Sequence, residues 1–113
     1  MPTAKDIGNR GEEIASIYLQ QHGFKILARN WRTRWCEIDI IAQKDAIFYF
    51  VEVKYRASTV HGSGVDYITP KKLQQMQFAA ELWGNTQKQD IDMVLAVISI
   101  DGSTHDVTFI EIA

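Results

Sequence analysis

The sequence predicts an α/β fold in the order helix, three strands, helix, two strands, and three observations support this. Apolar residues recur at helical spacing from about residue 6 to residue 22. Two runs rich in β-branched and aromatic residues flank the polar break Gln43-Lys44-Asp45, a pattern typical of a β-hairpin. Thr69-Pro70 then predicts the start of a second helix, with threonine as N-cap and proline at the first helical position.

The first helix is expected from Asp6 to His22. At 100° per residue, Glu12 falls at the border of the apolar stripe, whereas Glu13 falls nearly opposite it and should be solvated. Gly8 and Gly11 lie beside Glu12, and each costs ~1 kcal/mol of helix stability relative to alanine. One interpretation is a frayed first turn. The other is that the glycines let this helix bring Glu12 to a site on the strands.

The first strand is expected at Phe24 to Ala28, and one cluster of basic and aromatic residues follows it. The members of this cluster are Arg29, Trp31, Arg32, Arg34 and Trp35. Such residues can hold phosphates and stack on nucleobases. The alternative is a strand end whose tryptophans cover the core and whose arginines are solvated.

The hairpin that follows carries the strongest functional signal. A symmetric hairpin places Asp39 and Glu52 abreast on one face, and strand alternation adds Lys54 to that face. Ile38 and Ile40 are expected together on the other face. Paired carboxylates beside an ammonium suit Mg²⁺ and the metal-assisted hydrolysis of a phosphate ester. The alternative is a solvated ladder of ion pairs at a sheet edge.

A polar, glycine-containing loop is expected from Tyr55 to Asp66. It is either a mobile flap that covers substrate or a connection without a function of its own. The second helix then runs to about Trp83. Lys71 and Lys72 lie in its first turn, where they oppose the helix dipole, and this placement suits a bound phosphate. The last two strands are expected at Ile91–Ile100 and Val107–Ile112.

Composition limits the possible functions. The 113 residues predict one domain spanning residues 1–113. The formal net charge of −2 provides no overall basic field, so contacts with nucleic acid must come from local clusters, or from a homodimer that combines two such faces. The single cysteine, Cys36, excludes an internal disulfide and favours a cytoplasmic location. No apolar run is long enough to span a bilayer, so no membrane partner is expected.

Several motifs together resemble the small bacterial YraN-like family of the PD-(D/E)xK nuclease superfamily, which is similar in fold to archaeal Holliday junction resolvases. The matching motifs are Gly11-Glu12, Gly23-Phe24, Arg29-Asn30, Glu37-Ile38-Asp39-Ile40-Ile41-Ala42, Phe50-Val51-Glu52-Val53-Lys54 and Thr69-Pro70-Lys71-Lys72. The resemblance implies a restriction-endonuclease-like three-layer fold with a central mixed sheet, formed by a single nuclease-like domain. Cys36 and Tyr55 depart from the family pattern, which has a glycine and a small residue at these positions.

The resemblance also implies roles for individual residues. Asp39, Glu52 and the Val53 carbonyl are expected to bind Mg²⁺ or Mn²⁺, with Lys54 as the superfamily lysine and Glu12 as the helix acid. The expected contacts to nucleic acid come from Arg29, Arg32, Arg34, Arg56, Lys71 and Lys72. The implied activity is metal-dependent hydrolysis of DNA phosphodiester bonds, with branched or junction DNA as the candidate substrate. The alternative is a non-catalytic module of this fold that binds nucleic acid or protein.

Overall fold

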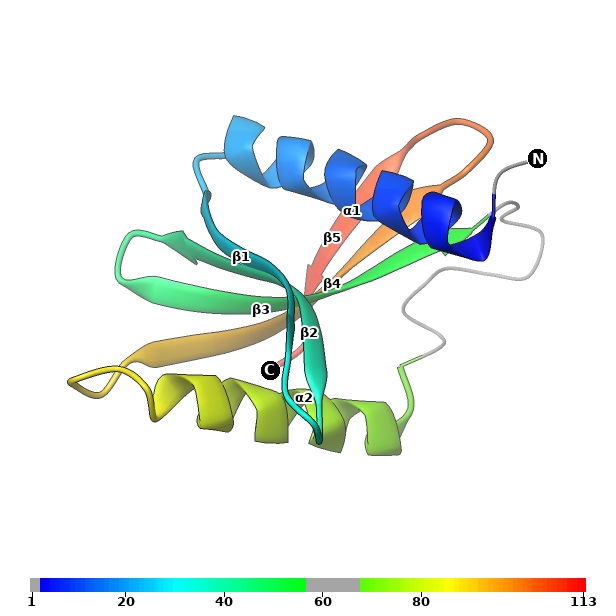
Figure 1. Cartoon of the computed structure of the whole chain (residues 1–113). Coiled ribbons are helices and arrows are strands. Elements are labelled where there is room, and N and C mark those ends of the chain that lie inside the picture. The colour runs from blue at the N-terminus through cyan, green and yellow to red at the C-terminus, as the bar shows by residue number, and fades with distance from the viewer. Residues whose placement is uncertain (1–2, 57–67) are drawn as a thin grey trace.

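A computed structural model of the chain describes residues 3–56 and 68–113 and shows a five-stranded sheet between two helices (Figure 1). The elements are α1 (Ala4–Gln21), β1 (Lys25–Arg32), β2 (Glu37–Lys44), β3 (Ile47–Arg56), α2 (Pro70–Gly84), β4 (Asp92–Asp101) and β5 (Val107–Glu111). The predicted α/β class and element order are confirmed. The three layers are compatible with a restriction-endonuclease-like fold.

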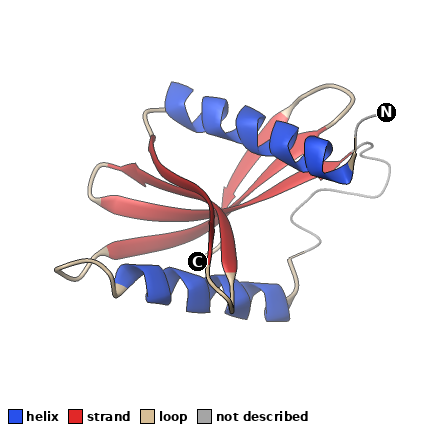
Figure 2. Ribbon diagram, in the orientation of Figure 1, coloured by secondary structure: helices blue, strands red, loops and turns tan. Residues whose placement is uncertain are grey.

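The sheet is mixed, with the strands in the order β1-β2-β3-β4-β5. β1, β2 and β3 are antiparallel neighbours, β3 and β4 are parallel, and β5 returns antiparallel to β4. A parallel pair requires a crossover connection, and α2 lies in the one between β3 and β4. α1 covers one face of the sheet and α2 covers the other (Figure 2).

Each helix packs on its own apolar core. On the α1 face, Ala15 and Leu19 of the helix are fully buried among strand residues such as Val51 and Ile98. On the α2 face, Met76, Ala79 and Ala80 are buried against strand residues that include Phe50 and Leu95. Because both faces of the sheet are covered, the apolar side chains of β2 and β3 are buried on both faces.

The helix starts follow the expected chemistry. Thr3 caps α1 in a capping box with Asp6, which begins the helix two residues before its predicted start. Thr69 accepts a hydrogen bond from the Lys72 N–H and caps α2, with Pro70 in the first turn, as predicted. Neither of the two helices in the described part of the chain has the length and apolar character that crossing a bilayer requires.

Two strands extend beyond their predicted ends. β1 continues into the basic cluster as far as Arg32, because its residues pair with β2 as far as Glu37. β3 includes Tyr55 and Arg56, which were expected in the loop, because both pair with β4. The rest of the expected flap, residues 57–66, lies outside the described residues.

The β2–β3 hairpin opens at one end. Pairing between these strands stops at Ile40 and Val51, although both strands continue beyond that point. β3 stays paired with β4 as far as Arg56, whereas the first part of β2 stays with β1. We call the resulting gap, between Glu37–Asp39 of β2 and Glu52–Arg56 of β3, the fork.

The side chains of β2 follow this divergence. Ile40 is buried on the α1 face, but Ile38 is buried on the α2 face, beside Met76 and Ile41. The prediction that Ile38 and Ile40 share a face is therefore wrong. The beginning of β2 lies near α2 (Figure 1), so Ile38 reaches the core on that face, while the Asp39 carboxylate accepts a hydrogen bond from the Val53 N–H across the fork.

Candidate active site

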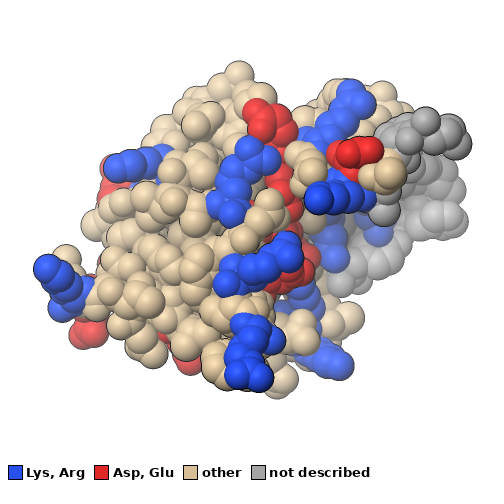
Figure 3. All heavy atoms as spheres, in the orientation of Figure 1, with Lys and Arg blue, Asp and Glu red and all other residues tan. Residues whose placement is uncertain are grey.

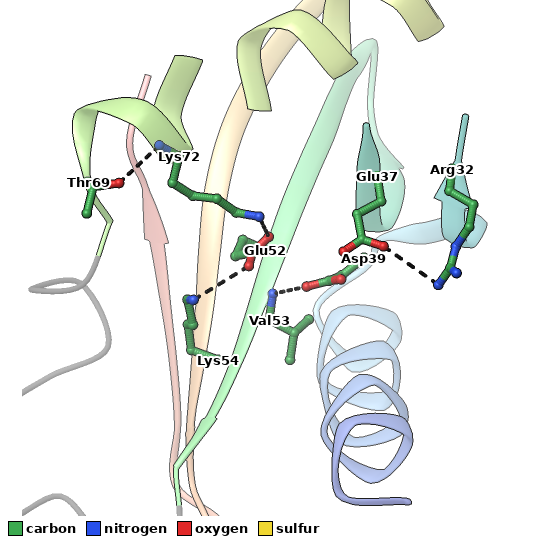
Figure 4. Close-up of polar contacts among 8 residues, drawn as sticks. All are labelled: Arg32, Glu37, Asp39, Glu52, Val53, Lys54, Thr69 and Lys72. Carbon is green, nitrogen blue, oxygen red and sulfur yellow. Dashed lines mark hydrogen bonds and ion pairs between the residues drawn. The ribbon is translucent and has the colours of Figure 1, made fainter. Parts of the chain in front are cut away.

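The Asp39 side chain replaces a backbone hydrogen bond that the β2–β3 hairpin lacks beyond Ile40 and Val51. The Val53 N–H donates a hydrogen bond of 2.8 Å to Asp39 Oδ2 (Figure 4). Continuing the register would pair Val53 with Ile38, but Ile38 has left the pairing with β3. The Asp39 carboxylate therefore satisfies the backbone donor that the opening of the strands exposes. Within a β-strand, the N–H and C=O of one residue point to the same side, so the Val53 carbonyl also faces the fork.

Glu52 lies between two lysines. Its Oε1 is 3.7 Å from Lys54 Nζ, and its Oε2 is 3.3 Å from Lys72 Nζ (Figure 4). Only 12% of the Glu52 side chain is exposed, so water screens these pairs less than it screens surface pairs. Lys54 comes from the same strand, whereas Lys72 reaches down from the first turn of α2. The two ammonium groups thus hold both oxygens of one carboxylate.

The first helix contributes Glu12, and its neighbour Glu13 faces the opposite way. Glu12 lines the same pocket as Asp39 and Glu52, and its Oε2 is buried without a hydrogen-bond partner among the described residues. Glu13 is exposed and pairs at 2.8 Å with Arg29 of β1. The predicted phase of the helix is therefore confirmed. A buried carboxylate oxygen without a partner is costly unless another group, such as a cation, satisfies it.

The neighbouring acids Glu52 and Glu12 make it harder for Asp39 to carry a negative charge. The pKa of Asp39 is raised from 3.8 to about 6, chiefly because the carboxyl is buried and next because it lies near the negative charge of Glu52. Glu12 adds to the rise, while the Val53 hydrogen bond and the charge of Lys72 oppose it. Among the described residues, the three carboxylates of Glu12, Asp39 and Glu52 face only the two ammonium groups of Lys54 and Lys72, which leaves one negative charge without a counter-charge. Such an arrangement favours a bound cation.

These residues line an open pocket of about 410 Å³ beside the start of α1. Both helices begin on the side of the molecule where β3 ends (Figure 1), so the positive ends of both helix dipoles face this region and favour anions there. A Cβ at Gly11 would lie 3.0 Å from Tyr55 Cβ, so glycine lets α1 approach β3 closely. At Gly8 a Cβ would meet nothing within 4 Å, and this residue leaves the pocket wall open.

The donor set fits a hard divalent cation. Within the described residues, no three side chains among His, Cys, Asp and Glu come close enough to share one metal ion. The protein therefore offers two carboxylates, Asp39 and Glu52, and the Val53 carbonyl. Mg²⁺ is commonly bound by one or two carboxylates, with waters and substrate phosphates completing its shell. Glu12, whose Oε2 has no hydrogen-bond partner among the described residues, lines the same pocket as Asp39, Glu52 and Val53.

The residues predicted to contact nucleic acid do not form one basic surface. Arg29 is paired with Glu13, Arg32 lies 3.7 Å from Glu37, and the Arg34 guanidinium lies 5.3 Å from the centre of the Trp35 ring. Lys71 is exposed on α2, whereas Lys72 enters the fork. Arg56 ends β3, where its carbonyl accepts a hydrogen bond from the Gly102 N–H. Figure 3 shows Lys and Arg side chains interspersed with Asp and Glu along the middle of the visible face.

Sequence reasoning missed the place of Lys72. Lys72 was expected to contact a phosphate at the start of the helix, and the structure places its ammonium 3.3 Å from Glu52 Oε2. The signal was present, since a lysine in the first turn of a helix opposes the dipole and needs a compensating anion. Nothing in the sequence indicated that this anion is a carboxylate on β3.

Comparison with known proteins identifies the family. The model described as "Uncharacterised protein family UPF0102" matches residues 11–100. A UPF0102 protein of Vibrio parahaemolyticus is 37% identical over 109 residues, which are 95% of this chain and 90% of the relative. UPF0102 proteins of Leifsonia xyli and Chlorobium phaeobacteroides are 42% identical over 86 residues (76% of this chain, 73% of the relative) and 48% identical over 75 residues (66% and 59%). The chain therefore belongs to the UPF0102 (YraN-like) family, as its motifs predicted.

Proposed function

We propose that this protein is a metal-dependent endonuclease that hydrolyses phosphodiester bonds of DNA. The observation that carries the proposal is the fork, where Asp39, Glu52 and Glu12 come together with one negative charge more than the two lysines balance. A binding module for a polyanion gains nothing from buried carboxylates at its centre, because they repel phosphates. A hydrolase that binds a divalent cation needs them.

The residues of the fork divide the chemistry among them. Asp39, Glu52 and the Val53 carbonyl would hold Mg²⁺ or Mn²⁺, which supplies Lewis-acid activation of water and neutralises charge that develops on the phosphate. Lys54, beside Glu52, positions the attacking water or stabilises charge on the phosphate oxygens. Lys72 lies on the other side of Glu52 and contacts the phosphate backbone of the incoming strand.

Branched or single-stranded DNA is the proposed substrate class, because these substrates can present a sugar-phosphate backbone to an open pocket on a small protein. The experiment incubates purified protein with branched, single-stranded and duplex DNA in Mg²⁺, Mn²⁺ or EDTA. We expect cleavage only with metal. The variants Asp39→Asn and Glu52→Gln keep the shape of each side chain but remove its charge, so each should abolish cleavage and leave DNA binding intact or tighter.

Glu13→Gln is the matched control, since Glu13 is an acid on the same helix as Glu12 but faces solvent. Cleavage by Asp39→Asn at the wild-type rate would indicate a contaminating nuclease and remove the basis of the proposal. If the wild-type protein cleaves no substrate but binds branched DNA with steep salt dependence, the non-catalytic module is the correct function.

A further inference from the structure

Trp35 differs from the other two tryptophans in its environment. Trp31 packs against the core of the α2 face, and the Trp83 ring lies 5.4 Å from Phe48 and 5.6 Å from Phe50. Trp35, in contrast, is 70% exposed. A large aromatic ring held in water at the end of a hairpin contributes nothing to the core, and it offers one stacking surface to a ligand.

The turn that carries Trp35 is already ordered. The Thr33 N–H donates to the Cys36 carbonyl at 2.8 Å, and the Trp35 N–H donates to Thr33 Oγ1 at 3.1 Å. Thr33 Oγ1 also lies 3.4 Å from Cys36 Sγ. Because these bonds fix the backbone, a ligand that stacks on Trp35 does not have to order the turn, which lowers the entropic cost of binding.

A second pocket connects Trp35 to the fork. This pocket, of about 380 Å³, is lined by Arg32, Trp35, Glu37, Lys72, Gln75 and Met76, together with Thr33 and Cys36 of the turn. Lys72 belongs to both places, because it lines this pocket and its Nζ lies 3.3 Å from Glu52 Oε2. A polynucleotide whose phosphate lies at the fork would therefore pass Lys72 and bring a neighbouring nucleotide beside Trp35.

The charges beside Trp35 suit a polyanion. Arg32 and Lys72 line the pocket, where they lie near Glu37 and Glu52 respectively, and the Arg34 guanidinium beside the Trp35 ring adds a third positive charge. A tryptophan ring can stack only on a base whose face is free. In a continuous duplex the neighbouring base pairs cover both faces, so only an unpaired or extruded base qualifies. The Gln75 amide at the pocket wall is available to hydrogen-bond a base edge.

We propose that Trp35 and the Lys72-lined pocket form a subsite for an unpaired nucleotide next to the phosphate held at the fork. This inference rests on the proposed nuclease function, which places a DNA phosphate at the fork. It narrows the substrate to DNA that contains single-stranded or unpaired positions. Trp35 then selects the structure of the substrate, while the carboxylates and Lys54 act on the backbone.

The test measures binding in EDTA, so that no cleavage occurs. Full-length protein is titrated into fluorescent oligo(dT) and into a blunt duplex of the same length. We expect Trp35→Ala to weaken binding to oligo(dT) by about 10-fold and to change duplex binding by less than about 2-fold. Trp35→Phe should restore most of the affinity, and oligo(dT) should quench Trp35 fluorescence in the wild type. Ile17→Ala, which removes an exposed apolar side chain from α1, should have no effect.

Salt dependence separates stacking from charge. Trp35→Ala should lower affinity for oligo(dT) at every salt concentration without changing the slope, whereas Arg34→Gln should flatten the slope by about 0.7. Wild-type protein that does not bind oligo(dT), or Trp35→Ala protein that binds it normally, would overturn the inference, as would equal losses on oligo(dT) and duplex. Because cleavage plays no part, Trp35-dependent binding without nuclease activity would leave this subsite standing and remove only the proposed function.

Discussion

The two ends of the β2–β3 hairpin contain the same residue types in different settings. At the turn end, Lys44 pairs with Ile47 in the sheet ladder, and Lys44 and Asp45 are both exposed. At the fork end, Asp39 and Lys54 are partly buried, and the ladder is interrupted. Asp45 and Lys44 at the turn end are thus exposed to solvent, whereas Asp39 and Lys54 at the fork end are partly buried and interact with neighbouring polar and charged groups.

Cavity size does not explain this difference. The turn end borders the larger hollow, of about 800 Å³, between β3 and the segment that joins α2 to β4. The pocket at the fork has about half that volume. Asp90 and Asp92 are the acids that line the larger hollow, whereas Glu12, Asp39 and Glu52 line the pocket at the fork, so we take the smaller pocket as the site. What distinguishes the fork is incomplete strand pairing in a sheet that helices cover on both faces.

The comparison predicts the largest difference in cleavage rate between variants of Lys54, at the fork, and Lys44, at the turn end. If the fork is catalytic, Lys54→Ala should reduce the single-turnover cleavage rate by ~100-fold, because it removes a preorganised charge beside the scissile phosphate. Lys44→Ala, at the turn end, should change the rate by less than about 2-fold, since the Lys44 ammonium lies 5.1 Å from the Phe24 ring centre, away from the fork. Equal rates for the two variants would contradict the assignment of the site.

The two aspartates should differ in their effect on stability. The raised pKa of Asp39 means that the folded state binds the proton more tightly than the unfolded state. This contribution to stability is fully present below about pH 4 and is lost as the pH rises through about 6. At pH 7, Asp39→Asn should therefore stabilise the metal-free protein by about 1–2 kcal/mol, less than the full cost of the shift.

Urea unfolding across this pH range measures the effect. The stability of the wild type should fall between about pH 4 and 6 relative to Asp39→Asn, and Mg²⁺ at pH 7 should restore stability only to the wild type. Asp45→Asn is the control, because Asp45 is exposed with φ of 56°, a conformation that asparagine also adopts. If the free energy of unfolding depends on pH in the same way for Asp39→Asn and Asp45→Asn, the fork does not raise the pKa of Asp39.

Glu12 and Glu13, adjacent acids on α1, should differ in their effect on metal affinity. Glu12→Gln should weaken Mn²⁺ binding by about 10-fold in calorimetry, because the change removes a negative charge from the pocket that we propose holds the ion. Glu13→Gln should leave metal affinity unchanged and lose only the exposed pair with Arg29, worth at most about 1 kcal/mol. A larger loss for Glu13→Gln would reverse the assignment.

Lys72 should show the smallest effect, and its direction is informative. Because its ammonium lies 3.3 Å from Glu52, it competes with a cation for that carboxylate, and Lys72→Gln should tighten Mn²⁺ binding by about 3-fold. The neighbouring Lys71→Gln should have no effect, since Lys71 is exposed. Weaker binding by Lys72→Gln would instead show that Lys72 orients Glu52 for the ion.

The sequence predicted the element order, the Asp39, Glu52 and Lys54 grouping and the inward phase of Glu12, because periodicity determines all of these locally. It did not predict the fork, since the loss of pairing beyond Ile40 depends on how β2 packs against α2. The ion pairs of Arg29 and Arg32 and the reach of Lys72 were missed for a related reason. Each joins segments whose relative position is set by tertiary packing and not by spacing along the chain.

The Val53 amide provides the site with a natural reporter. Its proton is bonded to a side-chain carboxylate and not to a backbone carbonyl, so its resonance frequency follows the charge carried by Asp39. Its exchange with solvent deuterium follows how firmly that side chain stays in place. A single backbone cross-peak can therefore distinguish protonation of the acid, capture of Mg²⁺ and local opening of the fork, without a label on any functional group.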